Sequence, residues 1–150
     1  MQVTGPTTAH AVDRNFPASL KGREEVPPVD TKAAGQAKFQ LSKDGSELAF
    51  KLIVANIEDV TQAHIHLAPV GVNGDIVVFL FGFDPAGVTT NGILSEGTIT
   101  TDDLIGPLLG ATLDDLVAEL RSGDAYVNVH TIVHPGGEIR GQIRTSGPKE

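Results

Sequence analysis

The sequence predicts an all-β protein, an antiparallel β-sandwich with a short helical insertion near residues 101–122. Two observations indicate this class. Seven or eight short segments are apolar at alternate residues or apolar throughout, as strands are. The 17 glycines and 9 prolines among the 150 residues supply turns between these segments. With 40% hydrophobic and 20% charged residues the composition is globular, and we expect one domain over residues 14–145 between tails at 1–13 and 146–150.

Five strands are predicted in the first half of the chain. A turn containing Gly45 joins the second strand to the third in a hairpin. Between the first two strands, Pro27 and Pro28 exclude their segment from the middle of a sheet. The fifth strand is apolar at almost every position. This pattern is typical of a strand buried on both faces and also of a strand at a dimer interface, so a homo-oligomer is a second possibility. The predicted strands span residues 15–20, 35–42, 47–55, 60–67 and 75–83.

The second half adds three strands, at 93–101, 125–130 and 138–145, with the helical insertion between the first two of them. A first helical signal begins near Thr100 and leads into a leucine-rich segment. In a second signal, Thr112 and Asp115 form a capping pair, apolar residues follow at helical spacing, and a glycine stops the helix. We expect these helices to be an insertion between strands and not a second layer.

Composition and charge disfavour several classes of function. A net charge of -8 with 11 scattered basic residues argues against a nucleic acid partner. No run of about 18 apolar residues occurs, so we expect no membrane span, and the polar N-terminus lacks a signal-peptide core. The chain has no cysteine, which removes disulfides, zinc-thiolate sites and thiol catalysis. Its serines stand outside any nucleophile-elbow motif, which disfavours a hydrolase.

Four of the five histidines lie in two short segments and indicate a metal site. His64 and His66 alternate with apolar residues on a predicted strand, so their side chains project from one face. His130 and His134 flank the end of another strand much later in the chain. Imidazoles without thiolates favour copper, with zinc as the alternative. The competing interpretation is that the histidines are exposed and bind no metal. For His134, which precedes a proline in a turn, this interpretation is as good as metal binding, and for His10 in the predicted tail it is better.

Two further residues are predicted near this site from their positions on strands. Asn128 lies two residues before His130, so the two share a face and Asn128 can form hydrogen bonds at the site. If the isoleucines beside it face the core, Arg140 faces outward on the side of the histidines, where its charge would guide a small anion. The competing interpretation is an ion pair of Arg140 with a carboxylate on a solvated strand. Glu24 or Glu25 is a candidate for orienting a histidine ligand.

Three motifs occur in an order typical of one family. They are KGREEVPPV at 21–29, AHIH at 63–66, and YVNVHT at 126–131 followed by HPGGEIRGQI at 134–143. Together they resemble the CHRD domain, a module named from chordin and widespread in microbial proteins. The resemblance implies an extracytoplasmic β-sandwich (secreted, periplasmic or at the cell surface), and we expect that its targeting segment is not present in this chain. It assigns no single activity, because in chordin the domain is part of a secreted binding protein.

A second likeness concerns chemistry. The histidine strand, the late histidine and the following Gly-rich turn resemble the copper ligands of copper/zinc superoxide dismutase, itself an antiparallel sandwich. This resemblance implies that His64, His66 and His130 bind copper and that His134 completes the set, which makes Arg140 the catalytic candidate for guiding superoxide. The chain departs from that enzyme by lacking its zinc-holding loop pattern and both cysteines of its disulfide.

Two function hypotheses follow. The first is a metal-binding oxidoreductase that uses copper for superoxide dismutation, with superoxide as its small anionic substrate. The alternative is a noncatalytic metal carrier, or an extracellular binding or adhesion module whose histidines are structural.

Overall fold

The computed structural model describes residues 13–146, and within them the chain forms an antiparallel β-sandwich with one helical insertion. The predicted fold class is therefore confirmed, while the predicted tails lie almost wholly outside the described residues. The strands are β1 Asn15–Lys21, β2 Ala34–Leu41, β3 Leu48–Ala55, β4 Val60–Leu67, β5 Asp75–Gly82, β6 Gly92–Ile99, β7 Ala125–Thr131 and β8 Ile139–Gln142. The helical segments are η1 Gly22–Glu24, η2 Thr101–Asp103, η3 Gly106–Leu108 and α2 Leu113–Ser122.

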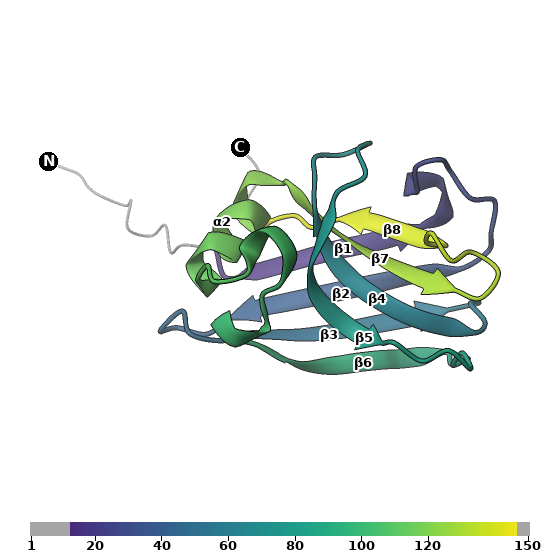
Figure 1. Ribbon diagram of the computed structural model, residues 1–150, viewed down its shortest axis with the longest axis horizontal. Helices are drawn as coiled ribbons and strands as arrows, with labels where there is room; N and C mark the ends of the chain where they lie inside the picture. Colours follow the sequence, from purple (N-terminus) through teal and green to yellow (C-terminus); the bar gives the residue numbers. More distant parts are fainter. Residues whose placement is uncertain (1–12, 147–150) are drawn as a thin grey trace, which may run out of the picture.

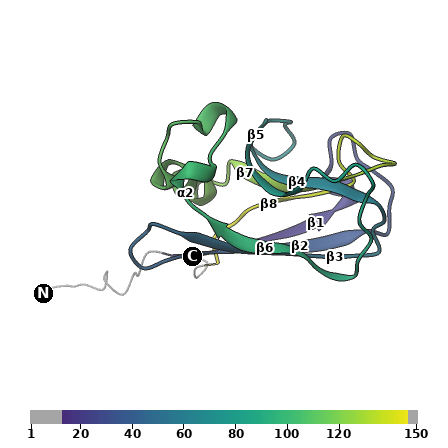
Figure 2. The same cartoon turned by 60° about the horizontal axis from the view of Figure 1, so that its bottom comes forward.

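The eight strands are hydrogen-bonded in the order β5-β4-β7-β8-β1-β2-β3-β6. This sheet folds over into two layers, with β5, β4, β7 and β8 facing β1, β2, β3 and β6 (Figure 2). Where its two ends approach each other, the Ser95 hydroxyl of β6 donates a hydrogen bond of 2.6 Å to the Leu80 carbonyl of β5. The core between the layers is apolar and includes Phe16, Leu20, Phe39, Leu48, Leu52, Ala63, Ile65, Val127, Val129 and Ile139.

The helical insertion lies between β6 and β7 and packs at one end of the sandwich (Figure 1). Its main helix, α2, begins with a capping box in which the Asp115 carboxylate accepts hydrogen bonds from the Thr112 amide at 3.0 Å and the Thr112 hydroxyl at 3.1 Å. Gly123 ends the helix in the left-handed conformation, as predicted. The earlier signal near Thr100 produces two short 3-10 turns and not an α-helix, since Gly106 and Pro107 interrupt it.

Strand β5 occupies a different position from the one its apolar sequence indicated. It is the last strand of its layer and therefore an edge strand, not one buried on both faces. Phe79, in its middle, is 44% exposed. Among the described residues, no helix is long and apolar enough to cross a membrane.

Candidate metal centre

Three histidines from two neighbouring strands meet on the face of β4 and β7 that points away from the core. In the antiparallel register, His64 lies opposite Asn128, and Gln62 lies opposite His130. This register places His130 beside His64 and His66, as their alternation on the strands predicted. One nitrogen from each of the three rings lies within 4.8 Å of the others. We call His64, His66 and His130 the histidine trio.

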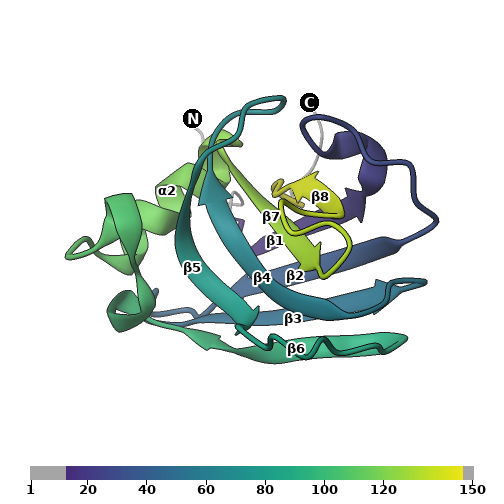
Figure 3. The same cartoon turned by 45° about the vertical axis from the view of Figure 1, so that its right-hand side comes forward.

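The trio is covered by other parts of the chain. The three side chains are 1%, 7% and 8% exposed, in chain order. The segment after β1 and the loop between β4 and β5 rise beside β8 on this side of the sandwich (Figure 3), and the Asn73 side chain joins them by donating to the Val26 carbonyl at 3.2 Å. Burial of three polar rings is costly unless their nitrogens find partners.

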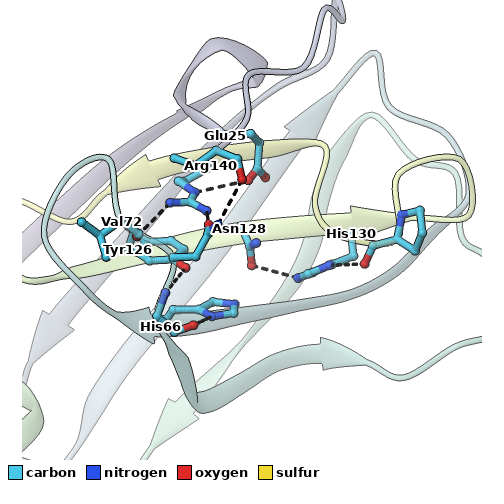
Figure 4. Close-up of polar contacts among 11 residues, drawn as sticks. Glu25, His66, Val72, Tyr126, Asn128, His130 and Arg140 are labelled. Carbon is cyan, nitrogen blue, oxygen red and sulfur yellow. Dashed lines mark hydrogen bonds and ion pairs between the residues drawn. The ribbon is translucent and has the colours of Figure 1, made fainter.

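Hydrogen bonds indicate which ring nitrogen of each histidine keeps a lone pair. The Nδ1 atoms of His66 and His130 lie 2.9 Å and 2.8 Å from the carbonyl oxygens of Gly74 and Pro135 (Figure 4). A carbonyl only accepts, so each Nδ1 carries the proton and each Nε2 keeps a lone pair. In His64, Nε2 lies 2.9 Å from the Gln62 side-chain oxygen, which leaves the lone pair on Nδ1. Each ring thus presents one unprotonated nitrogen for a metal.

Two of these nitrogens are buried without a partner. Nδ1 of His64 and Nε2 of His66 have no hydrogen-bond partner among the described residues. An unsatisfied buried nitrogen costs roughly 1–3 kcal/mol, and such groups in a native fold require an explanation. A metal ion between the rings would supply the missing partner for both. The residues present therefore fit a metal bound by imidazoles.

Aromatic contacts hold the rings in place. The His66 ring stacks on Tyr126, with centroids 4.8 Å apart and planes 4° from parallel. The hydroxyl of Tyr126 also accepts a 3.0 Å hydrogen bond from the Gly74 amide, so one residue positions both the ring and the loop that orients it. Position 74 requires glycine because a Cβ there would overlap the Leu67 carbonyl oxygen. His64 packs edge-on against Phe79, with centroids 4.4 Å apart.

The trio is held in its neutral form. Burial, followed by the charges of His130 and His66, lowers the pKa of His64 from 6.5 to about 3. Burial is also the largest cause that lowers the pKa of His66 and of His130, and the positive charge of Arg140 acts in the same direction on both. A metal binds only the neutral imidazole. The rings are therefore ready for a metal at neutral pH.

The acid sensitivity of the metal-free protein tests this conclusion. The unfolded chain takes up the His64 proton near pH 6.5 and the folded chain only near pH 3, so stability falls as pH drops through this window. For His64 alone the loss is about 2 kcal/mol between pH 6.5 and about pH 5. Burial raises the pKa of Glu25 to about 7, so its contribution to stability grows as pH falls from 7 to 4.5. This opposing effect is common to the wild type and to a His64 variant, so the difference between the two isolates His64.

Urea unfolding with a chelator, at about pH 7 and about pH 5, measures the effect. His64→Ala should show a smaller pH difference than the wild type, by about 2 kcal/mol. His134→Ala is the matched control and should keep the wild-type difference. An unchanged difference in His64→Ala would contradict a buried, neutral His64.

Arg140 shares the face of the trio, as predicted, but it is not exposed to solvent. Its side chain is 4% exposed, and all three guanidinium nitrogens donate hydrogen bonds within the protein. The acceptors are the Glu25 carboxylate at 3.2 Å, the Val72 carbonyl at 3.2 Å and the Asn73 side chain. The guanidinium also lies 4.0 Å from the centre of the Tyr126 ring. Loops cover this part of β8, so the expected outward position on a solvated strand is wrong.

The carboxylate pairing with Arg140 is therefore a buried ion pair. Glu25 is 3% exposed, and it contacts Arg140 instead of a histidine ligand, which was the expected role of Glu24 or Glu25. Burial is the largest influence on its pKa and outweighs the opposing effect of Arg140. The pair joins the segment after β1 to β8 beneath the loop that contains Val72.

His134 does not belong to the trio. It is half-buried in the turn between β7 and β8, and the group of histidines that the described residues bring together does not include it. Its backbone builds the turn, since its amide donates to the Thr131 hydroxyl at 3.1 Å and its carbonyl accepts from Gly137 at 3.0 Å. His134, the fourth ligand expected from the sequence, is thus a turn residue outside the trio. His10 lies outside the described residues.

Asn128 contacts the trio as its position on β7 predicted, with Oδ1 3.0 Å from Nε2 of His130. Gln62 and Tyr126 were missed, although the same strand alternation places both on this face. The carbonyls of Gly74 and Pro135 come from loops and leave no periodic signal in the sequence. Two hollows of about 420 and 660 Å³ lie over β1 and β2, and neither contains any residue of the trio.

Comparison with known proteins identifies the family. A family model of the CHRD domain matches residues 16–143, nearly the whole described chain. This chain belongs to the CHRD domain family. The domain is 31% identical over 137 residues to chordin from Danio rerio and 30% identical over the same length to chordin from Xenopus laevis. Each alignment covers 85% of this chain but only 13% of the chordin, so this chain spans a small part of the length of those relatives.

Proposed function

We propose that this CHRD domain holds one copper(II) ion, or zinc(II) in its place, through the histidine trio, and works as a noncatalytic metal-holding module. The observation that carries the proposal is the pair of buried nitrogens, Nδ1 of His64 and Nε2 of His66, that lack partners. Three neutral imidazoles without thiolates suit both metals, and copper binds more tightly at equal availability.

The surroundings of the trio favour holding a metal over turning over an anion. Copper would supply a redox centre, and superoxide dismutation remains the enzymatic alternative. That reaction needs a positive group that draws superoxide in, because the chain carries a net charge of -8. Arg140 is the candidate for this role, but its three guanidinium nitrogens donate hydrogen bonds to Glu25, Val72 and Asn73. The Glu25 carboxylate beside it also offsets part of its charge at a distance.

The relatives of the domain support a proposal about its location and its partners. The relatives are named chordin and are far longer than this chain. We therefore place the domain outside the cytoplasm, as an extracellular binding module that acts as one unit of a larger assembly. In this setting the metal would contribute stability and shape to the binding module, since any ligand that binds only the folded state stabilises it.

A titration of chelator-treated protein with copper(II) and with zinc(II) tests the proposal. We expect one equivalent of either metal to bind and copper to displace zinc. Folding is not expected to require the metal, because the apolar core between the layers is complete without it. Superoxide consumption by the copper-loaded protein, compared with the same copper in buffer, then separates the two functions. Binding without added turnover supports the module, faster turnover supports the enzyme, and absence of stoichiometric binding refutes both.

A further inference from the structure

The side chain of Asn128 contacts one of the three ring nitrogens that the histidine trio offers to a metal. Asn128 is a buried residue of β7, opposite His64 on β4 and opposite Arg140 on β8. Its side-chain amide lies 3.0 Å from Nε2 of His130, the nitrogen that His130 would offer to a metal (Figure 4). Of the three metal-facing nitrogens, this is the only one with a hydrogen-bond partner among the described residues.

The proton positions decide what kind of contact this is. Nδ1 of His130 lies 2.8 Å from the Pro135 carbonyl, which can only accept, so Nδ1 holds the single proton of a neutral ring. A buried imidazole without an anionic partner stays neutral, so Nε2 carries no second proton. Nε2 must then accept, and Asn128 must donate through its NH₂ group. The oxygen and nitrogen of an amide are assigned from such hydrogen bonds, so we exchange these two atoms of Asn128: the NH₂ occupies the position that Figure 4 draws as Oδ1 and faces His130.

We propose that Asn128 is a place-holder that caps Nε2 of His130 in the metal-free domain and turns away when the metal enters. The inference rests on the proposed function and deepens it, because it assigns a residue that sets the metal affinity. A metal ion and an N–H donor compete for the same lone pair. Binding the metal therefore breaks the Asn128 hydrogen bond, and the intact amide weakens metal binding.

Removing the amide should tighten metal binding. Asn128→Ala leaves Nε2 of His130 without its donor in the metal-free state, which raises the free energy of that state but not of the metal-bound one. A hydrogen bond of typical net strength corresponds to about a fivefold gain in copper affinity. Competition with a chelator of known affinity measures it. Asn128→Ser is a second variant, for use if the alanine variant does not fold.

A matched control is Gln142→Ala. Gln142 is a neighbouring amide on β8 that donates to the carbonyls of Ala68 and Gly123, both at 2.8 Å, and not to the trio. Its loss should leave copper affinity unchanged. If wild-type protein binds copper but Asn128→Ala binds it equally or more weakly, the place-holder is overturned while the metal site stands. Absence of copper binding by the wild type overturns both.

Nitrogen NMR of the metal-free protein gives a readout that needs no metal. In the wild type, Nε2 of His130 should have the ¹⁵N shift of an unprotonated nitrogen that accepts a hydrogen bond. In Asn128→Ala it should move toward the shift of a free, unprotonated nitrogen, while Nδ1 stays protonated. A proton on Nε2 in the wild-type protein would overturn the inference.

Discussion

His66→Ala is expected to lower copper affinity at least about 100-fold, more than the typical effect of losing a residue that only orients a ligand. His66 supplies Nε2, a buried nitrogen without a partner, and its ring is fixed by the Gly74 carbonyl and by stacking on Tyr126. No other histidine in the described part of the chain lies within the cluster to take its place. Isothermal titration of chelator-treated protein with copper(II) measures the loss.

His134→Ala is the matched control for this substitution. It removes an imidazole from the turn between β7 and β8 without touching the trio, so copper affinity and stoichiometry should stay at the wild-type values. Circular dichroism of both variants verifies that the sandwich is intact. Equal copper affinity in His66→Ala and the wild type would mean that the trio is a structural cluster.

Arg140→Ala is expected to destabilise the protein by about 3–5 kcal/mol, because it leaves the Glu25 carboxylate buried without its partner. The guanidinium also joins the segment after β1 to the loop between β4 and β5, through Glu25 and Val72. Copper stoichiometry should not change, since Arg140 offers no ligand atom. The midpoint and slope of urea unfolding at neutral pH give the free energy of unfolding.

Arg23→Ala provides the comparison for this effect. Arg23 and Glu24 form an exposed ion pair at 3.7 Å, and exposed pairs contribute about 0–1 kcal/mol. The double variant Arg140→Met with Glu25→Leu should recover much of the lost stability, because it removes both charges together. If Arg140→Ala costs no more than Arg23→Ala, the buried pair does not hold the loops over the trio.

Alternation along strands was enough to predict which residues share the face of the site. His64, His66, Asn128 and Arg140 were each placed on one side of the sheet by their position relative to apolar neighbours. The registers of β7 with β4 and with β8 confirm this placement. The capping pair of α2 was also predictable, because a capping box and its terminating glycine are local signals.

The cover over the site could not be predicted from the same patterns. Whether a strand face meets solvent or a loop depends on contacts between residues far apart in sequence, such as Arg140 with Glu25 and Asn73 with Val26. For this reason Arg140 was expected at the surface and is buried. His134 was expected as a ligand because it lies close to His130 in sequence, but the turn built on its own backbone keeps it out of the trio.

The most direct test of a metal centre at the histidine trio is the electron paramagnetic resonance spectrum of protein loaded with one equivalent of copper(II). We expect a single copper species with hyperfine coupling to three imidazole nitrogens in the wild type, and to one nitrogen fewer in His66→Ala. His134→Ala should give the wild-type spectrum. A wild-type spectrum of aqueous or backbone-bound copper, unchanged by His66→Ala, would contradict a metal centre at the histidine trio.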